Sequence, residues 1–227
     1  MFFDVETTGL VDPEIVQLFA WTNDETGIIQ GFFRSKKPIE IGAMATHHIT
    51  NEMVKDCSLF SNSEQIRGLN ALSGKFGHTF IAHNAEFDIG CVKRYGIVPD
   101  KFICTMHVAK AFFKYSGKKP ESYGLQYLRY FAGLEFDESI NPHDAKSDVL
   151  VLMSLYGLLK TQFSINEMIE ITKEALKPQN FEFRFGKHRG KTIGEIAKIE
   201  RSYLRWCLEN QGDDIKSKII AFKESIQ

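Results

Sequence analysis

The N-terminal part of the chain alternates short apolar runs with groups of turn-forming residues. Apolar and β-branched side chains dominate residues 1–6, 14–22 and 28–34, and the turn at 23–27 separates the last two runs. Short apolar runs bounded by turn residues predict strands, and strands that follow one another this closely pair as an antiparallel meander. The opening of the sequence therefore predicts three antiparallel strands.

Farther along the chain the pattern predicts helices with two more strands between them. Strands are expected at 78–82 and 101–104, and helices at 85–95, 105–115, 122–131 and 144–160. The clearest helix is the last, whose apolar face consists of Val149, Leu152, Met153, Tyr156 and Leu159. A meander followed by strands that alternate with helices predicts an α/β fold with a mixed five-stranded sheet flanked by helices.

The C-terminal part has a pattern of its own and predicts a second, small unit. Residues 161–180 are expected to form a connecting helix, and the unit itself occupies 181–227. Its expected elements are a strand at 181–185, a basic turn at 186–191 and a helix over 192–210. Tyr203, Trp206 and Leu208 are expected in its core rather than in a base-stacking platform. The first domain then spans residues 1–160.

Composition places the chain among soluble globular proteins. Of its 227 residues 43% are hydrophobic and 25% are charged, which provides enough apolar surface for a core. No apolar run is long enough to cross a membrane, and the first residues lack the basic start and apolar stretch of a secretion signal. The cysteines are widely spaced without a CxxC pair, so we expect a reducing, cytoplasmic location and no disulfide framework.

Charge is distributed unevenly along the chain. Residues 178–227 hold ten Lys and Arg against seven Asp and Glu, a net of +3, whereas residues 1–177 hold eighteen against twenty-two, a net of −4. The net charge of −1 for the whole chain does not by itself indicate a nucleic-acid-binding protein. The C-terminal module is the basic part.

Two carboxylates lie close together on the first predicted strand. Asp4 and Glu6 are two positions apart, so both side chains point to the same face. Such a pair is tolerated when a cation lies between the carboxylates, although two solvated acids at an exposed strand end would give the same pattern. The turn Thr7-Thr8-Gly9 follows at once and offers hydroxyl groups and a backbone that a ligand can approach closely.

Two further acids lie near the starts of predicted helices. Asn84 is a natural N-cap, and Asp88 then lies one turn into its helix, where it could simply complement the helix dipole. Asp148 lies beside the buried stripe of its helix, and His143 precedes it by five positions. A histidine at that spacing is on a different helical face, so it must reach Asp148 from the loop or the first turn. The alternative is a capping histidine near a surface acid.

Each of these motifs alone is a moderate signal, but their order along the chain makes them much more specific together. DxETTGL on the first strand, HNAxFD after the fourth and HxAxxD at the last long helix resemble the DEDDh 3′→5′ exonucleases over about residues 1–160. The segments THHIT at 46–50 and ICT at 103–105 resemble further parts of that family. The resemblance implies a ribonuclease H-like fold with His143 as general base. It also implies metal-binding carboxylates at Asp4, Glu6, Asp88 and Asp148.

Phosphodiester hydrolysis needs these residue types. Two hard cations roughly 3.5–4 Å apart can activate a water molecule and stabilise the leaving oxygen, and hard cations prefer oxygen ligands. We expect two Mg²⁺ ions, for which Mn²⁺ should substitute. We assign Asp4, Glu6 and Asp148 to the ion that carries the water. Asp4 is expected to bridge the two ions, and Asp88 to lie on the side of the second ion. An imidazole titrates near neutrality, which suits His143 to accept the proton of the water.

Substrate contacts are expected from other residues of the same motifs. The 3′-terminal nucleotide is expected to contact the turn after the first strand, which consists of Thr7, Thr8, Gly9 and Leu10. The Thr-Gly backbone should hold the 3′ end, and Leu10 should pack on the base. Asn84 is expected to orient the site. His48 is expected either to contact phosphate or to have a structural role.

A run of basic residues marks the C-terminal module. The segment GKHRGKT at 186–192 has one residue too few between its glycines for a phosphate-binding P-loop. Four basic residues come within eight positions without an acid: Arg184, Lys187, Arg189 and Lys191. This run indicates a turn that contacts phosphates, and a solvated basic hairpin is the alternative. FxFGKxxGKxIxEIA, with YLRWCLEN further on, resembles the tail of bacterial family members of the exodeoxyribonuclease X type.

The predicted activity is the metal-dependent release of 5′-mononucleotides from DNA 3′ ends, single-stranded or duplex, in DNA repair. RNA trimming is one alternative, because the carboxylates do not test for a 2′-hydroxyl. A polymerase proofreading subunit is another, with residues 161–227 as the tether to the polymerase. A nuclease fold used only for binding is expected to lack one of the five catalytic positions, and the sequence retains all five. DNA is the expected partner and a membrane is not. Whether RNA is also a partner is left open. The oligomeric state is open as well, and a homodimer is one possibility.

Overall fold

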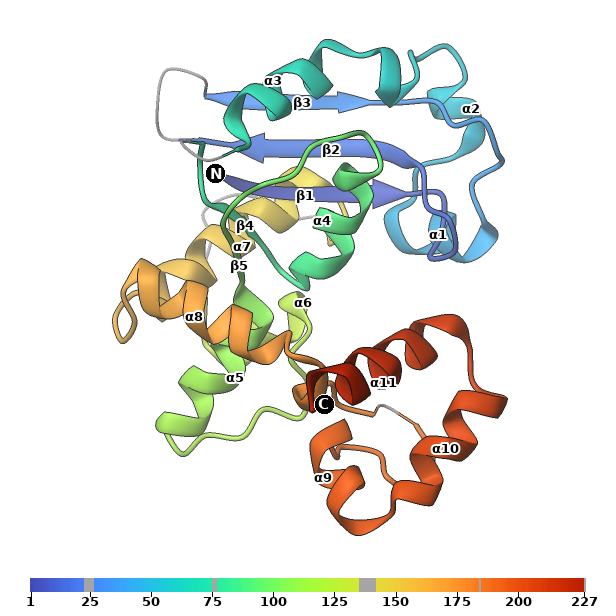
Figure 1. Ribbon diagram of the computed structural model, residues 1–227. Helices are drawn as coiled ribbons and strands as arrows, with labels where there is room; N and C mark the ends of the chain where they lie inside the picture. Colours follow the sequence, from blue (N-terminus) through green and yellow to red (C-terminus); the bar gives the residue numbers. More distant parts are fainter. Residues whose placement is uncertain (23–26, 75–76, 135–141, 184, 227) are drawn as a thin grey trace. The chain divides into compact units, whose positions relative to one another are not determined.

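The structure is a computed structural model that describes residues 1–227 except 23–26, 75–76, 135–141, 184 and 227 (Figure 1). The chain forms two compact units, Met1–Ile169 and Glu170–Gln227, and each is described by itself. Within the described residues, none of the helices combines the length and the apolar character needed to cross a membrane.

A mixed five-stranded sheet forms the centre of the first unit. Its strands are β1 (Phe2–Thr7), β2 (Ile15–Trp21), β3 (Ile28–Phe32), β4 (Phe80–Ala82) and β5 (Phe102–Cys104). In the order β3-β2-β1-β4-β5, the first three strands are antiparallel neighbours, and β4 is parallel to both β1 and β5. The predicted mixed sheet with its opening meander is therefore confirmed.

Eight helices of the described chain follow or cover this sheet. They are α1 (Ile41–His47), α2 (Asn51–Val54), α3 (Glu64–Leu72), α4 (Ala85–Lys93), α5 (Thr105–Tyr115), α6 (Leu125–Phe131), α7 (Ala145–Leu159) and α8 (Ile165–Ala175). A single 3-10 turn, η1 (Phe60–Asn62), precedes α3. The helices predicted at 105–115 and 144–160 agree with α5 and α7 almost to the residue.

Alternation along β1 assigns its two faces to different helices (Figure 1). Phe3 and Val5 belong to the core cluster that also contains Leu69 of α3 and Ile89 of α4. Phe2 points the other way, and its ring packs edge-on against Tyr156 of α7 with the centroids 5.1 Å apart. Because side chains alternate along a strand, the even positions of β1 face α7.

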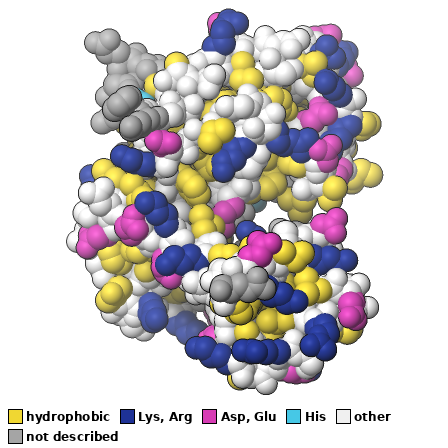
Figure 2. Space-filling model, viewed as in Figure 1, with side chains coloured by type: hydrophobic (Ala, Val, Ile, Leu, Met, Phe, Trp, Pro, Cys, Tyr) yellow, Lys and Arg dark blue, Asp and Glu magenta, His cyan; other side chains and the backbone are white. Residues whose placement is uncertain are grey.

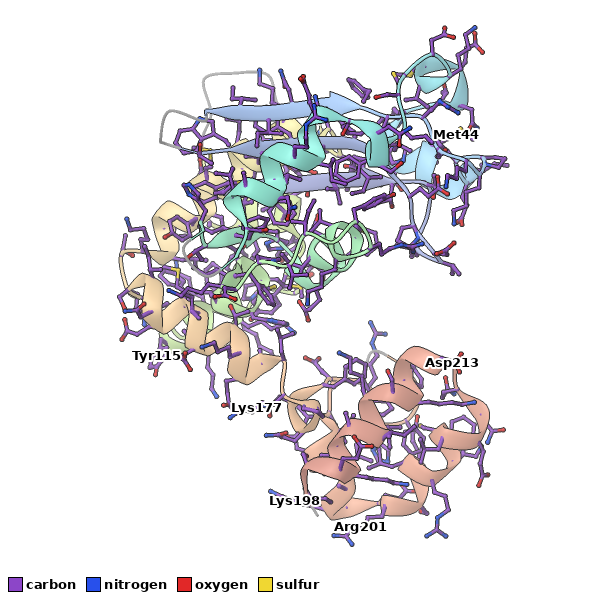
Figure 3. The ribbon with its side chains drawn as sticks, turned by 45° about the horizontal axis from the view of Figure 1, so that its top comes forward. Met44, Tyr115, Lys177, Lys198, Arg201 and Asp213 are labelled. Atoms are coloured by element: carbon purple, nitrogen blue, oxygen red, sulfur yellow. The ribbon has the colours of Figure 1, made fainter. Side chains whose placement is uncertain are left out.

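The second unit has a small core of its own. It contains η2 (Pro178–Asn180), α9 (Ile193–Ile199), α10 (Arg201–Asn210) and α11 (Asp213–Ser225), of which α11 was not predicted. Its buried residues are Phe183, Ile193, Ile196, Tyr203, Leu204, Cys207, Ile219 and Phe222. Figure 3 labels four positions of this unit: Lys177, Lys198 of α9, Arg201 of α10 and Asp213 of α11.

Three predictions for this unit are wrong in part. Among the described residues of the strand expected at 181–185, the structure has an isolated bridge between Glu182 and Thr192, and a tight turn follows. The helix expected over 192–210 is broken at Glu200, whose backbone leaves the helical region (φ −157°, ψ 76°) while its carboxylate binds Lys187 and His188. Tyr203 is buried as expected and Leu208 packs on the core, but Trp206 is 47% exposed.

Candidate active site

The first two acids of the site lie on the central strand of the first unit. Asp4 and Glu6 are even positions of β1, so they share the face of Phe2 that is directed toward α7. Asp4 pairs in register with Phe19 of β2, and Glu6 pairs with Gln17. The carboxylates therefore stand on a strand that has a neighbour on each side, which holds their backbone in place.

The third acid comes from the start of α4. Asp88 is the fourth residue of this helix, as expected, and it is 3% exposed. The backbone N–H of Val5 donates a hydrogen bond to Oδ1 of Asp88 over 3.2 Å, which ties α4 to β1 at the level of Asp4 and Glu6. Asn84 does occupy the N-cap position, but it adopts a left-handed conformation (φ 62°) and its side chain makes no capping hydrogen bond. The predicted N-cap position is therefore confirmed, without a side-chain capping hydrogen bond.

The fourth acid and the histidine come from the start of α7. Asp144 is the N-cap, and its carboxylate accepts a hydrogen bond from the backbone N–H of Ser147 over 3.1 Å. This cap begins the helix so that Asp148 lies one turn farther on, where it is 7% exposed. His143 precedes the cap with φ 61° and is exposed. Its ring and the carboxylates of Glu6 and Asp148 offer ligand atoms that all lie within 4.8 Å of one another.

Burial and mutual repulsion make these carboxylates hard to ionise. Burial, together with the neighbouring acids Asp88 and Glu6, raises the pKa of Asp4 well above its ordinary value. Burial followed by the charge of Asp148 raises the pKa of Glu6 to about 8, and burial raises the pKa of Asp88 to about 8. The pKa of Asp148 is raised as well, again chiefly by burial. A bound cation would remove this penalty, because an opposite charge favours the ionised form.

The donor set fits a hard divalent cation. All four acids offer carboxylate oxygens, which are the ligands that Mg²⁺, Mn²⁺ and Ca²⁺ prefer. A separate group of potential ligands, Glu86, Cys104 and His107, lies between α4, β5 and α5 and contains a thiol and an imidazole. Its mixed donors distinguish it from the carboxylate group, and it includes none of the acids that the sequence motifs predict.

The structure adds polar residues that sequence reasoning missed. Nε2 of Gln126, on α6, donates to Oδ1 of Asp148 over 2.5 Å. Nε2 of Gln17 donates to Oδ1 of Asp144 over 2.8 Å, and Oε1 of Gln17 accepts from the backbone N–H of Ala145. Gln17 is the lone polar residue of an otherwise apolar β2, which is a signal that could have identified it. The sequence around Gln126 contains no comparable signal.

The turn after β1 is held by its own hydroxyl groups. The Thr7 hydroxyl donates to the backbone oxygen of Gly9 over 2.9 Å, and Oγ1 of Thr8 accepts from the backbone N–H of Glu14 over 3.0 Å. Gly9 lies against the carboxyl end of the Glu40 side chain, whose carboxyl carbon would be 2.3 Å from an added Cβ, so a larger residue would require that side chain to move. Leu10 follows with 81% of its surface exposed and is free to meet a ligand.

Two adjacent histidines border the site in different ways. His47 is buried at the end of α1, and its Nε2 lies 3.0 Å from the backbone oxygen of Thr7, which fixes the turn after β1. His48 is exposed with φ 62°. It lines a pocket of about 370 Å³ together with Gln17, Phe32, His47, Ile49, Met53, Pro142, His143 and Asp144. The structure therefore places His48 beside the catalytic candidate His143.

Three predicted binding residues belong to the second unit. Lys187, Arg189 and Lys191 are exposed on the turn that begins at Gly186. Nζ of Lys187 pairs with Oε1 of Glu200 over 2.6 Å. Arg184 lies outside the described residues. The basic turn and the carboxylates are thus parts of two separately described units.

Comparison with known proteins identifies the family of the chain. Residues 1–156 match the family described as "Exonuclease" (RNase_T), and residues 183–211 match the one described as "Exodeoxyribonuclease X-like C-terminal". The chain therefore belongs to this exonuclease family. It is 27% identical over 212 residues to exodeoxyribonuclease 10 of Escherichia coli strain K12, which covers 91% of this chain and 89% of that protein. DNA polymerase III PolC-type of Staphylococcus epidermidis is 28% identical over 185 residues, 76% of this chain and 12% of that protein.

Solved structures support the ribonuclease H-like fold expected from the sequence. A structure of exonuclease X in complex with 5′ overhanging duplex DNA has a TM-score of 0.55 and 26% identity, covering 75% of this chain and 98% of that one. E. coli exonuclease I in complex with a dT13 oligonucleotide has a TM-score of 0.59 and 17% identity, and the match covers 79% of this chain and 43% of that one. At its lower identity, the second likeness concerns the fold alone.

Proposed function

We propose that this chain is a metal-dependent 3′→5′ exonuclease that releases 5′-mononucleotides from DNA ends in DNA repair. The observation that carries the proposal is the convergence of four mutually repelling carboxylates from β1, α4 and α7, two of which, Glu6 and Asp148, lie beside His143. The names of two similar proteins support DNA as the substrate, since one is an exodeoxyribonuclease and the other was solved with an overhanging DNA duplex.

The carboxylates are proposed to hold two Mg²⁺ ions, with Mn²⁺ able to replace them. The residues that would hold the ions are Asp4, Glu6, Asp88 and Asp148. When bound, such ions activate water and stabilise the charge that develops on the leaving oxygen. The hydrogen bonds from Val5 to Asp88 and from Gln126 to Asp148 orient two of the acids before any ion binds.

His143 is proposed to accept the proton of the attacking water at a ring nitrogen. Its position just before the N-cap of α7 puts the ring beside Glu6 and Asp148. General base catalysis requires the base to be within hydrogen-bond reach of the water that it deprotonates, and water on an ion held by Glu6 and Asp148 would lie near this ring.

Substrate contacts are proposed on both units. The fixed turn of Thr7, Thr8 and Gly9 would hold the 3′-terminal nucleotide, and the exposed Leu10 would pack on its base. His48 would contact a phosphate, since it is exposed in the pocket beside His143. Asn84 would orient the substrate from the start of α4. Phosphates farther along the strand would meet the exposed cations Lys187, Arg189 and Lys191.

Substrates of matched sequence test this proposal. The purified chain with Mg²⁺ is given single-stranded DNA, duplex DNA with a 5′ overhang and the corresponding RNA, each labelled at the 5′ end. We expect stepwise shortening of both DNA substrates, and we expect a DNA strand with a blocked 3′ end to stay intact. Faster hydrolysis of the RNA strand would contradict DNA as the substrate, and hydrolysis of the blocked strand would contradict the 3′ direction.

A further inference from the structure

The most exposed large aromatic side chain of the C-terminal unit is found on α10, among the residues that the structure describes. Trp206 is 47% exposed, although its neighbours Tyr203 and Cys207 are buried in the core of the unit. A single exposed hydrophobic residue is ordinary in soluble proteins. The surroundings of Trp206 therefore decide whether its exposure has a use.

Trp206 rests on a second aromatic ring that is itself held in place. Its ring stacks on Tyr203 with the centroids 5.6 Å apart and an interplanar angle of 28°. Tyr203 is 8% exposed, and its hydroxyl oxygen would lie 2.3 Å from a Cβ added at Gly186. Gly186 (φ +66°) thus lets the turn close over Tyr203. Because one ring face is occupied by Tyr203, the exposed area of Trp206 comes from its other face and its edge.

A cation and a pocket adjoin this pair of rings. Nζ of Lys187 lies 5.3 Å from the centroid of the Tyr203 ring, within the range of a cation–π interaction. Glu200 anchors the lysine, and its second oxygen lies 2.8 Å from Nε2 of His188. The rings, Lys187, Glu200 and Ser202 line an open pocket of about 400 Å³.

The C-terminal residues 178–227 carry more cations than anions. Arg189, Lys191, Arg201 and Arg205 are exposed in the same unit, and residues 178–227 carry ten Lys and Arg against seven Asp and Glu. Figure 2 shows Lys and Arg side chains gathered along the visible face of this unit beside hydrophobic ones. In Figure 3 the side chains of Lys198 and Arg201 point away from the body of the unit. Such a surface complements a polyanion.

We propose that Trp206, resting on Tyr203 beside Lys187, is a stacking site for an unpaired nucleobase of single-stranded DNA. A nucleobase offers a flat π-face that stacks on an aromatic ring whatever its sequence, and the phosphates of the strand meet the surrounding cations. Paired bases are already stacked within a duplex, so the site takes single strands. The inference rests on the proposed function, since it assumes a DNA substrate, and adds a contact with bases outside the carboxylate site.

The fluorescence of Trp206 reports on this site directly. The chain has two tryptophans, Trp21 and Trp206, so Trp21→Phe leaves Trp206 as the reporter and Trp206→Phe leaves Trp21 as the matched control. Each protein is titrated in EDTA with an oligothymidylate of about twelve nucleotides, a length within the usual range of single-strand sites. We expect the oligonucleotide to quench the emission of Trp206 and to leave that of Trp21 unchanged.

Substitutions separate stacking from other contributions. Trp206→Ala should weaken oligothymidylate binding by roughly 5- to 150-fold, the range that corresponds to the loss of one stacked base. Trp206→Phe should restore part of the affinity, whereas Trp206→Leu, which is apolar but has no aromatic face, should not. Circular dichroism and thermal unfolding check that each variant is folded, which we expect because the side chain is half-exposed.

The outcomes distinguish this inference from the proposed function. If the unaltered chain binds and degrades the oligonucleotide but Trp206 emission does not change, the stacking site is wrong and the nuclease proposal stands. Full affinity in Trp206→Leu, or equal quenching by an abasic strand or an acidic peptide, would also overturn the stacking site. If the unaltered chain neither binds nor degrades DNA, both proposals fail. Matched quenching by oligouridylate would extend the site to RNA, since the nucleobase is the shared feature.

Discussion

The backbone N–H of His143 donates a hydrogen bond to Oδ2 of Asp148, with the two atoms 3.2 Å apart. The proposed base and a proposed metal ligand are therefore joined through the backbone of the base. A positive φ is uncommon for a residue other than glycine, and His143 adopts one at 61°. This conformation, together with the cap at Asp144, places the ring beside Glu6 and Asp148.

Loss of the imidazole should reduce turnover without removing the metal. We expect His143→Ala to lower the turnover rate by roughly 10²- to 10⁴-fold, the usual contribution of a positioned general base. Calorimetric titration with Mn²⁺ should give almost the same affinity as for the unaltered chain, because His143 is not proposed as a ligand. Abolished Mn²⁺ binding in this variant would contradict the role of base and indicate a ligand instead.

Gln126 should act on the site through Asp148. Removal of its amide in Gln126→Ala leaves Oδ1 of Asp148 without the donor on α6. Residues that orient a metal ligand typically contribute about 10- to 100-fold to metal affinity, so we expect a loss of that size in Mn²⁺ affinity. Tyr130→Ala, an exposed position of the same helix, is the control and should leave the affinity unchanged. Equal Mn²⁺ affinities in the two variants would show that Gln126 does not support the site.

The raised carboxyl pKa values predict that the metal-free protein loses stability as the pH rises. Unfolded, Glu6 and Asp88 ionise near their ordinary values of 4.5 and 3.8, but in the folded chain their pKa values are about 8. Between these values the folded state binds more protons than the unfolded state, so the free energy of unfolding falls with pH. In EDTA we expect Tm to fall by several degrees from pH 5 to pH 9.

Two comparisons assign this pH effect to the carboxylates. Asp88→Asn removes one of the groups and should flatten the dependence of Tm on pH. Saturating Mg²⁺ should stabilise the unaltered chain more at pH 9 than at pH 5, because cations bind the ionised carboxylates. If Tm in EDTA changes with pH equally in the unaltered chain and in Asp88→Asn, the raised pKa values at this site would be contradicted.

The basic turn should contribute to DNA binding through phosphates. We expect the triple substitution of Lys187, Arg189 and Lys191 by Ala to raise KM. It should also make the slope of log binding constant against log salt concentration shallower, by roughly 0.7 for each phosphate of a single strand that is no longer neutralised. Turnover at saturating substrate should change much less, because distant contacts bind ground and transition states alike. Ala at Lys216, Lys218 and Lys223 of α11 removes the same charge elsewhere. Equal effects of the two triple variants would show that net charge, not the turn, matters.

Local patterns in the sequence were sufficient to predict most of the first unit. The alternation along β1 puts Asp4 and Glu6 on one face, and the starts of α4 and α7 place Asp88 and Asp148 one turn into their helices. These placements follow from the two-residue period of a strand and the 3.6-residue period of a helix, and both periods are visible in the sequence. The meander and the helix at α7 are predictable for the same reason.

Contacts between distant segments were not predictable from local patterns. The hydrogen bond from Gln126 to Asp148 depends on how α6 packs against α7, which no spacing in the sequence records. The break between α9 and α10 falls at Glu200, whose carboxylate binds Lys187 and His188 of the preceding turn. The exposure of Trp206 likewise follows from tertiary packing, since Tyr203 occupies the core position beside it.

The proposed function is tested most directly by the fate of a single-stranded DNA labelled at its 5′ end. With Mg²⁺ the unaltered chain should convert it into a ladder of progressively shorter labelled strands, because nucleotides leave from the 3′ end. Asp4→Ala, which removes the most central carboxylate, and Asp148→Ala should leave the strand intact although both variants are folded, since the site then lacks a metal ligand. Early release of the labelled mononucleotide by the unaltered chain, or near-normal ladders with either variant, would contradict a 3′→5′ exonuclease built on these four carboxylates.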